Sequence, residues 1–557
     1  MMAIKLAVGD ESFDEIRKTG LYYVDKTELL YDLAGQTINK VTLFTRPRRF
    51  GKTLNMSMME SFFDINRDSR DVFEGLDISK HQTFCSEWMN RYPVLFISFK
   101  DVDGLNFESA YGQLQAILAD YCKTIISCFE NKSIDSADAE IFERLRYQNG
   151  SLSDVKGSLK TIMRMMNAVY GKPVILLIDE YDVPLAKASE KNTMQNRYYE
   201  QMLDVIKGML GVALKTNEYL KLAVVTGCLR IAKESIFTGT NNFASYSVTD
   251  EDFSEYFGFS REEVNLLLAD AGCMDKADII REWYDGYVFG NSRVYCPWDV
   301  ASYVAALMRR KDAEPKNYWR NTSSNGVIRD FVSHSDWGIP DRFETIMNGG
   351  TITVTVSDEL TYDTLHESEQ NLWSILLMTG YLTKADTAAG GQKVALKIPN
   401  AEIAGIFEDT VVKLFTDTLD TGRQKELMEA FWDEDIESAT KLLSDFLWDT
   451  ISYHDYHEDY YHAFMAGLFV GLGYSVDSNK ESGLGRFDIR AKDRKNRRIM
   501  IIEVKKADTA DRMNAACDEA IQQIVDKGYA KTIEPGYEKT ICYGISFFKK
   551  SAQIKKV

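Results

Sequence analysis

Short apolar runs alternate with amphipathic stretches in the first half of the chain. Four runs predict buried strands, at residues 41–44, 94–98, 174–178 and 222–226. Stretches of helical periodicity lie between them, for example residues 111–128 and 198–214. Strands and helices in alternation form a parallel sheet with helices on both faces. We therefore predict an α/β domain over residues 1–245, with a ligand site beyond the carboxyl ends of its strands.

The remaining chain divides into three parts by its composition and its hydrophobic pattern. Residues 246–340 are acidic and aromatic, which indicates a small helical subdomain that packs as a lid beside the first domain. Residues 341–448 mix turn residues with β-rich pieces and two helical stretches, 402–420 and 424–446, and we interpret them as a connector. Residues 449–557 return to short strands and amphipathic helices, and they predict a small second α/β domain.

A loop with the chemistry of a phosphate-binding site follows the first predicted strand. Residues 45–53 read Thr-Arg-Pro-Arg-Arg-Phe-Gly-Lys-Thr, and a helical stretch comes next. A helix N-terminus presents unpaired backbone N–H groups that can hold a phosphate. We expect Lys52 to reach the β- and γ-phosphates of a nucleotide and the Thr53 hydroxyl to ligate Mg²⁺. Arg46 replaces the first glycine of the usual motif and Pro47 follows it, so we expect a stiffer and more cationic loop.

Two acids, Asp179 and Glu180, end the apolar run at residues 174–178. A carboxylate at the edge of an apolar core is costly unless a cation or hydrogen bonds satisfy it. We predict that Asp179 holds Mg²⁺ and that Glu180 is the base that orients an attacking water. The alternatives are a chance Gly-Lys-Thr triplet and ordinary solvated acids at a strand end. The expected ligands are ATP or GTP with Mg²⁺, and the expected cofactor-binding residues are Arg49, Gly51, Lys52, Thr53 and Asp179.

A second set of charged residues lies near the C-terminus. Asp488 falls in one short predicted strand, and Glu503 and Lys505 fall in the next. Alternate residues of a strand share a face, so Glu503 and Lys505 project together, with Asp488 beside them. The two carboxylates can bind Mg²⁺, and Lys505 can orient or deprotonate a metal-bound water. An ordinary surface hairpin with the same spacing is the alternative.

Six basic residues crowd the turn between these two strands, opposed by Asp493. They are Arg490, Lys492, Arg494, Lys495, Arg497 and Arg498. Such a turn can dock a phosphate backbone. A solvated hairpin tip that keeps a sheet edge soluble is the alternative.

Several motifs together carry a family resemblance. They are residues 22–27 (YYVDKT), 46–53 (RPRRFGKT), 177–182 (LIDEYD), 226–235 (TGCLRIAKES), 485–488 (GRFD) and 503–505 (EVK). In combination they resemble the bacterial AAA-ATPase-like proteins that carry a C-terminal PD-(D/E)XK nuclease-like domain. The resemblance implies a P-loop NTPase with a helical lid, followed by a small restriction-endonuclease-like α/β domain.

The resemblance also implies roles for individual residues. Replacement of the first loop glycine, here by Arg46, is a trait of this family. Thr226 stands where related ATPases sense the γ-phosphate, and Gln523 matches a glutamine that related nucleases hold near the DNA backbone. Arg230 can stabilise charge near the γ-phosphate, although pairing with surface acids is the alternative for this arginine.

The bulk composition limits the remaining options. The 557 residues carry a net charge of −18, which argues against a surface coated for nucleic acid, so any DNA contact must be local. Eight cysteines without a C-x-x-C pair argue against a zinc ribbon or a disulfide framework. No apolar run is long enough to span a bilayer, and no signal-peptide pattern begins the chain. We expect a cytoplasmic protein without a membrane partner, and a homo-oligomer remains open.

The leading hypothesis is an ATP-binding and ATP-hydrolysing protein coupled to a Mg²⁺-dependent nuclease that acts on DNA through its C-terminal domain. In it, Asp488, Glu503 and Lys505 are catalytic in the nuclease and Glu180 is catalytic in the ATPase. The main rival is a nucleotide-dependent switch whose C-terminal domain binds nucleic acid or protein without cleaving it. An ATPase whose tail scaffolds an oligomer is a third hypothesis.

Overall fold

The computed structural model forms two compact units. The first contains Met1–Asn321 and Thr353–Glu402, and the second contains Thr322–Ile352 and Ile403–Val557. The structure describes residues 4–35, 39–130, 132–189, 198–231, 243–319, 339–347, 349–357, 360, 362, 368–385, 393–407, 421–450, 461, 464–465, 468–469, 474–478, 481–482, 485–486, 488–528 and 536–557. The division into four domains at residues 245, 340 and 448 stays a prediction.

A parallel sheet of five strands forms the centre of the first unit, in the order β2-β3-β4-β1-β5. The strands are β1 (Val41–Thr45), β2 (Val94–Ser98), β3 (Val174–Asp179), β4 (Leu220–Gly227) and β5 (Phe243–Tyr246). The four predicted strands are confirmed. The sequence did not indicate β5, because its four residues are only half-buried at the sheet edge and form no apolar run. Since β4 lies between β1 and β3, its end lies between the phosphate loop and the predicted acids.

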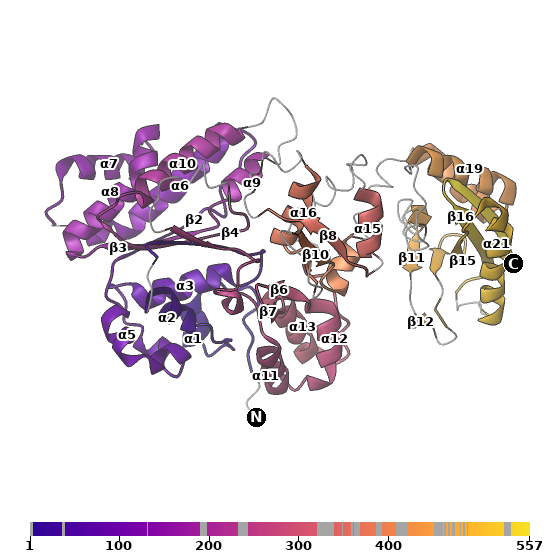
Figure 1. Ribbon diagram of the computed structural model, residues 1–557, viewed down its shortest axis with the longest axis horizontal. Coiled ribbons are helices and arrows are strands. Elements are labelled where there is room, and N and C mark those ends of the chain that lie inside the picture. Colours follow the sequence, from indigo (N-terminus) through magenta and orange to yellow (C-terminus); the bar gives the residue numbers. More distant parts are fainter. Residues whose placement is uncertain are drawn as a thin grey trace. The chain divides into compact units, whose positions relative to one another are not determined.

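Helices cover both faces of this sheet (Figure 1). One face carries α6 (Phe107–Ile125), α7 (Ser136–Arg146), α8 (Leu152–Tyr170) and α10 (Tyr199–Leu214), and the other carries α1 (Phe13–Lys18), α2 (Glu28–Ala34), α3 (Lys52–Phe63) and α5 (Gln82–Trp88). Two shorter helices are α4 (Arg70–Phe73) and α9 (Val183–Ser189). The helical stretches expected directly after the phosphate loop and at residues 111–128 and 198–214 correspond to α3, α6 and α10.

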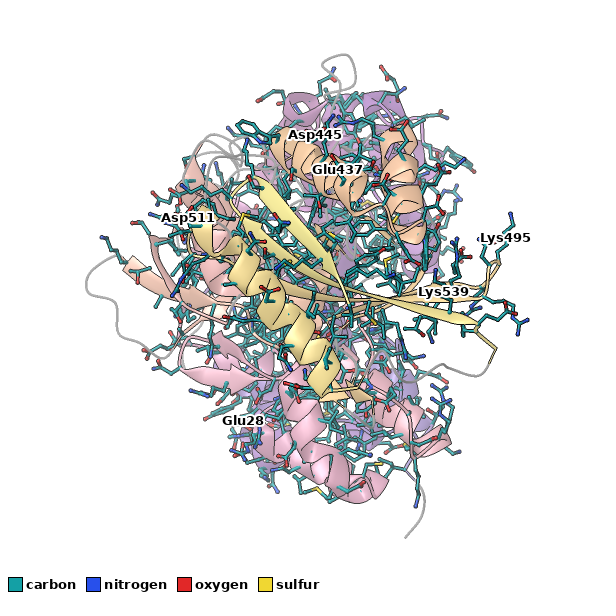
Figure 2. The ribbon with its side chains drawn as sticks, turned by 90° about the vertical axis from the view of Figure 1, so that its right-hand side faces the viewer. Glu28, Glu437, Asp445, Lys495, Asp511 and Lys539 are labelled. Atoms are coloured by element: carbon teal, nitrogen blue, oxygen red, sulfur yellow. The ribbon has the colours of Figure 1, made fainter. Side chains whose placement is uncertain are left out.

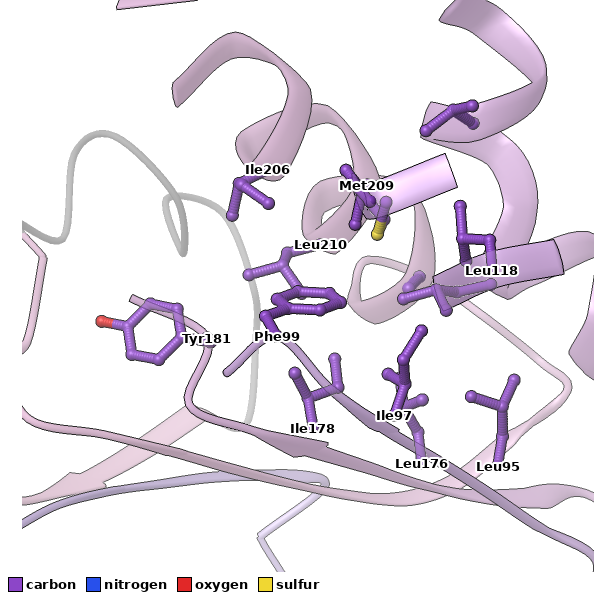
Figure 3. Packing of buried hydrophobic residues seen from close by; sticks show 14 of the residues in the cluster. Leu95, Ile97, Phe99, Leu118, Leu176, Ile178, Tyr181, Ile206, Met209 and Leu210 are labelled. Atoms are coloured by element: carbon purple, nitrogen blue, oxygen red, sulfur yellow. The ribbon is translucent and has the colours of Figure 1, made fainter. Parts of the chain in front are cut away.

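The core between sheet and helices is apolar and tightly filled. Figure 3 shows Ile97 of β2 and Ile178 of β3 facing Leu118 of α6 and Leu210 of α10, and all four side chains are buried. Burial of each such side chain contributes roughly 1.5–3 kcal/mol. The sheet is therefore a stable platform for the loops at its carboxyl edge.

Residues 246–319 form a helical subdomain within the first unit. It contains α11 (Arg261–Ala271), α12 (Ala277–Tyr284), α13 (Pro297–Arg309) and the hairpin of β6 (Tyr287–Phe289) and β7 (Ser292–Val294). Its interior is aromatic, with Tyr284 and Tyr303 fully buried. The aromatic residues of this segment are thus core residues, as the sequence analysis expected for a packed helical subdomain.

Residues 353–402 complete the first unit. They contribute α16 (Glu369–Met378) and a small sheet of β8 (Ile352–Thr355), β10 (Lys393–Lys397) and β9 (Thr383–Lys384). The Thr383 hydroxyl accepts a hydrogen bond of 2.9 Å from the backbone N–H of Val288, and Asn400 donates one of 2.8 Å to the Asp285 carbonyl. This segment therefore packs on the β6–β7 hairpin, which its sequence did not indicate.

A mixed sheet in the order β11-β14-β15-β16-β17 forms the centre of the second unit. Its strands are β11 (Ser475–Ser478), β14 (Ile489–Asp493), β15 (Arg498–Lys506), β16 (Lys539–Phe548) and β17 (Ser551–Lys556). The short strands β12 (Glu481–Ser482) and β13 (Gly485–Arg486) pair with each other, and α21 (Met513–Asp526) packs against the main sheet. A further helix of this unit is α15 (Ile339–Met347).

Two helices from the predicted connector pack on this C-terminal sheet. They are α18 (Thr421–Trp432) and α19 (Ile436–Thr450). The Tyr543 hydroxyl donates a hydrogen bond of 2.7 Å to the Phe431 carbonyl, and the Ala552 N–H donates one of 3.1 Å to Ser444 Oγ. The single helix predicted over residues 424–446 is wrong, because the chain turns at Glu434, whose φ is +61°. Residues 460–472 have the periodicity of an amphipathic helix, and the five positions of this stretch that the structure describes are buried, namely Tyr461, Phe464, Met465, Leu468 and Phe469.

Candidate nucleotide and metal sites

The phosphate loop, residues 45–53, connects β1 to α3. Arg49 and Gly51 adopt left-handed backbone angles, with φ of +71° and +81°. Gly51 is the residue before α3, where a glycine takes this conformation without steric cost. The Lys52 ammonium donates hydrogen bonds of 3.1 and 2.9 Å to the carbonyls of Arg46 and Pro47. The lysine therefore lies inside the curve of the loop, at the start of the helix.

Asp179 joins this loop to the end of β4. Its Oδ2 accepts a hydrogen bond of 2.9 Å from Thr53 Oγ1, and its Oδ1 accepts one of 2.5 Å from Thr226 Oγ1. Asp179 is fully buried, and burial raises its pKa, with the hydroxyls and Lys52 acting in the opposite direction. A hydroxyl oxygen and a carboxylate side by side are hard oxygen ligands of the kind Mg²⁺ takes, so these residues fit the ion.

Glu180 follows directly in a left-handed conformation, with φ of +52°. This is an uncommon conformation for a residue other than glycine, asparagine or aspartate, and it marks the end of the strand as a tight turn. Arg48 lies among Glu180, Asp182, Cys228 and Tyr362. Burial lowers the pKa of the Arg48 guanidinium, but these four groups together raise it above its usual value. The sequence analysis missed Arg48, because three arginines in one loop offered no reason to choose it.

Asp182 holds the segment that follows β4. Its Oδ2 accepts hydrogen bonds from the backbone N–H groups of Cys228 and Leu229, at 3.0 and 2.9 Å, and from the Tyr362 hydroxyl at 2.8 Å. Gly227 leaves the space that this contact needs, since a Cβ there would lie 2.6 Å from Asp182 Oδ1. Neither Tyr362 nor Gly227 carried a signal in the sequence. Of the γ-phosphate candidates, the structure brings Thr226 to Asp179, while the charge of Arg230 lies near Tyr181.

Arg46 and Arg49 point away from the inside of the loop. Arg46 is fully buried, donates to the carbonyls of Thr45 and Tyr246 at 2.9 and 2.8 Å, and stacks on Phe257. The expectation that Arg46 makes the loop more cationic is therefore wrong, since its charge lies in the core, where burial lowers its pKa to about 9. The Arg49 guanidinium donates to the Tyr318 carbonyl at 2.7 Å, on the helical subdomain.

The C-terminal sheet brings the second predicted set together. Asp488 precedes β14 by one residue, and its Oδ2 accepts a hydrogen bond of 2.8 Å from the Val504 N–H. Glu503 lies in β15 and is fully buried; its Oε1 accepts a hydrogen bond from Gln523, whereas its Oε2 is buried without one. Burial raises the pKa of Glu503 to about 7, Asp488 adds to the shift, and Lys527 and Lys505 oppose it. These four charged groups are therefore neighbours.

A divalent cation fits this arrangement. A buried carboxylate oxygen without a partner, next to a second carboxylate, is costly unless a cation neutralises it. Within the part of the chain that the structure describes, no three or more His, Cys, Asp or Glu side chains gather as a metal-binding group. Asp488 and Glu503 are thus the two carboxylates that could hold a cation at this site. Glu458 and His462, which the family resemblance implies as further contributors to this site, lie outside the described residues.

Two family models match this chain, one in each of the regions that contain these residues. A family model described as "Predicted AAA-ATPase" matches residues 7–237, and one described as "PD-(D/E)XK nuclease superfamily" matches residues 456–557. The chain carries an AAA-ATPase-like domain and, at its C-terminus, a PD-(D/E)XK nuclease-like domain. The chain is also similar to "Uncharacterized protein in vnfD 5'region" of Azotobacter chroococcum mcd 1, at 24% identity over 99% of this chain and 98% of the relative.

The basic turn of the nuclease-like domain lies away from Glu503. Figure 2 shows Lys495 of this turn and Lys539 at one end of the sheet and Asp511 at the other. Glu503 follows Arg498 by five residues of extended strand, a separation of roughly 17 Å. Part of the turn's charge is also matched locally, because Arg498 pairs with Asp493 at 3.0 Å and Arg497 with Glu538 at 2.6 Å.

Lys527 supplies a cation at the acidic site, and it was not among the residues predicted from the sequence. It follows Gln523 by four residues at the end of α21, so both side chains lie on one face of the helix. Gln523 reaches Glu503 from this face. The helical spacing was visible in the sequence, but the pairing of α21 with β15 was not.

No helix among the described residues has the length and apolarity needed to cross a bilayer.

Proposed function

We propose that this protein is an ATP-regulated, Mg²⁺-dependent nuclease that cleaves DNA, with ATP bound and hydrolysed in the ATPase-like domain. The observation that carries the nuclease assignment is the buried, unpartnered Oε2 of Glu503 beside Asp488, Lys505 and Lys527. The hydrogen bond between Thr53 and Asp179 carries the nucleotide assignment.

In the ATPase-like domain, the backbone of Gly51 shapes the loop and Lys52 binds the β- and γ-phosphates. Thr53 and Asp179 hold Mg²⁺, which neutralises phosphate charge when bound. Glu180 orients and deprotonates the attacking water. Arg49 also binds the nucleotide. Its guanidinium leaves the Tyr318 carbonyl and Asp299 and donates two parallel hydrogen bonds to phosphate oxygens.

In the nuclease-like domain, Asp488 and Glu503 hold the metal, which offsets charge on the scissile phosphate when bound. Gln523 fixes the orientation of Glu503 through its hydrogen bond to Oε1. Lys505 orients the attacking water and, in its neutral amine form, takes the proton of that water, and Lys527 provides a positive charge for the substrate backbone.

Local charge supports a nucleic-acid partner. Residues 488–557 contain sixteen lysines and arginines against ten aspartates and glutamates, in a chain whose net charge is −18. A phosphate backbone is therefore attracted to residues 488–557 more than to the rest of the chain; over residues 449–557 the count is eighteen basic against sixteen acidic residues. We propose DNA as the substrate, the cytoplasm as the location, and a homo-oligomer as an assembly state to be tested.

Cleavage assays test this proposal. Purified protein with Mg²⁺ or Mn²⁺ is expected to cut DNA, and Asp488→Ala and Lys505→Ala are expected to abolish cutting. Lys52→Ala is expected to remove only the dependence on ATP. Equal background cleavage by wild type and Glu503→Ala would overturn the nuclease assignment.

A nucleotide-dependent switch whose tail binds nucleic acid without cutting is the second candidate. It is favoured by the number of carboxylates, since among the described residues only Asp488 and Glu503 converge at the site. Metal-independent DNA binding that responds to ATP, without cleavage, is the result that supports it. If the tail only scaffolds an oligomer, ATP turnover will survive deletion of residues 449–557 while assembly is lost.

A further inference from the structure

Two buried carboxyl groups lie against each other in the first unit. Asp299 is in the first turn of α13, and Glu402 lies in the first turn of a helical segment at residues 401–407. Both side chains are fully buried. The side-chain partners of Asp299 are the Cys296 thiol and the Glu402 carboxyl group itself. Glu402 Oε1 accepts a hydrogen bond of 2.9 Å from the Trp319 N–H.

A proton shared by the two carboxyl groups would make this arrangement stable. Two ionised carboxylates have no donor between them, and their charges repel in a site without water. Burial raises the pKa of both groups, and the charge of Asp299 raises that of Glu402 further. Glu402 therefore stays protonated and donates a hydrogen bond to the Asp299 carboxylate. The pair carries a single negative charge.

The positive charge that faces this pair comes from the phosphate loop. Arg49 Nη1 lies 3.8 Å from Asp299 Oδ1, and the guanidinium also lies over the Trp298 ring. The Cys296 thiol, at the N-cap of α13, contacts the Arg49 carbonyl at 3.8 Å. The loop is thus held to the start of α13 by both the side chain and the backbone of Arg49.

The same carboxyl pair lies where the chain leaves the first unit. Glu402 is the last residue of that unit, and Trp319 lies two residues before Asn321, where the chain first leaves it. The hydrogen bond from Trp319 to Glu402 therefore joins two of the segments that lead into the second unit.

We propose that Asp299 and Glu402 are positioning residues that couple the phosphate loop, through Arg49, to the two segments leading into the nuclease-like unit. This inference rests on the proposed nucleotide binding. When phosphate draws Arg49 away, the buried charge of Asp299 loses its partner, which is strongly unfavourable. The pair must then rearrange, and the hydrogen bond between Glu402 and Trp319 weakens. Nucleotide binding in the first unit thereby loosens the segments that lead into the second.

Hydrogen exchange of the full-length protein tests the coupling, with and without a non-hydrolysable ATP analogue and Mg²⁺. In wild type, exchange of peptides that contain Trp319 and Glu402 is expected to rise about tenfold with nucleotide, as loss of one hydrogen bond to a buried carboxyl group predicts. Asp299→Asn is expected to bind nucleotide at least as tightly as wild type and to lose this response, because Arg49 no longer has a counter-charge to leave.

Two further variants keep the test decisive. Glu402→Gln preserves side-chain volume and the acceptor for Trp319, and it is expected to lose the response because an amide cannot give up its donor. Asp138→Asn alters a buried aspartate that pairs with Arg164 between α7 and α8, and it is expected to respond like wild type. Nucleotide binding without a response in wild type, or a normal response in Asp299→Asn, overturns the coupling alone. Absence of nucleotide binding overturns the proposed function as well.

Discussion

Thr53 donates a hydrogen bond of 2.9 Å to Asp179, although 126 positions of sequence separate the two residues. The contact brings the first turn of α3 to the end of β3 and aligns two candidate Mg²⁺ ligands. Because both side chains already satisfy each other, exchange of this hydrogen bond for a metal requires little movement.

Asp179→Asn is expected to keep the fold and lose the response to nucleotide. Wild type at a nucleotide concentration about 100-fold above Kd gains about 2.7 kcal/mol of stability, and the variant should gain almost none with Mg²⁺ present. Thermal unfolding with and without Mg²⁺-ATP measures the difference. Thr161→Val, at a buried threonine of α8, is the control and should respond like wild type. Equal stabilisation of Asp179→Asn would contradict the assigned role.

Arg46→Gly restores the glycine of the usual motif, yet it is expected to destabilise this protein. The change leaves the carbonyls of Thr45 and Tyr246 without their buried donor and removes stacking on Phe257. A loss of roughly 2–4 kcal/mol follows. Denaturant unfolding measures it. Arg46→Lys keeps the charge but not the planar guanidinium, so its free energy of unfolding should lie between those of wild type and Arg46→Gly. If Arg46→Gly were as stable as wild type, Arg46 would not anchor the loop.

Gly380→Ala is expected to disturb the phosphate loop, although the two are more than 300 positions apart in the sequence. Gly380 has φ of +85°, and a Cβ there would lie 3.0 Å from Pro47 and from Trp319. Gly20→Ala provides a matched control, because its φ is +66° but nothing lies within 4 Å. We expect Gly380→Ala to cost roughly 1–3 kcal/mol more than the control and to weaken nucleotide binding. Equal effects at the two glycines would show that backbone strain, not the contact with Pro47, is what matters.

The buried acid Glu402 predicts a specific dependence of stability on pH. Its pKa is raised from 4.5 to about 9, so the folded state binds a proton that the unfolded state has already released. Stability from this proton is complete below about pH 4.5 and falls as the pH rises towards 9. The difference in melting temperature between wild type and Glu402→Gln should therefore shift against wild type from pH 5.5 to pH 9. A difference that stays constant over this range would contradict the protonated pair.

Lys527→Ala is expected to impair cleavage more than a change in the basic turn. Lys527 is close enough to Glu503 to oppose the rise in its pKa, whereas Lys495 lies in the basic turn, at the end of the sheet opposite Asp511. We expect kcat/KM for DNA cleavage to fall about tenfold or more in Lys527→Ala, as for loss of one cation beside a reacting phosphate. Lys495→Ala should chiefly weaken binding and its salt dependence. The reverse ranking would place the substrate along the turn.

The predictable parts of this molecule were local in sequence. Residues 41–53 and 174–180 each combine an apolar strand with its polar end, and the spacing of Glu503 and Lys505 follows from strand alternation. The missed parts depend on contacts between distant segments. Tyr362 reaches Asp182 across 180 positions, and no periodicity reports such a contact. The direction of Arg46 was also hidden, because a sequence does not say whether an arginine faces a ligand or carbonyls in the core.

The return of residues 353–402 to the first unit has a consequence for how the protein is made. Ribosomal synthesis delivers the N-terminal segments first, but Tyr362, Gly380 and Glu402 are needed to complete the surroundings of the phosphate loop. The nascent chain must therefore extend past residue 402 before its ATPase-like part is finished. A shortened chain that stops near residue 340, the predicted end of the helical lid, would lack the residues that pack around the phosphate loop.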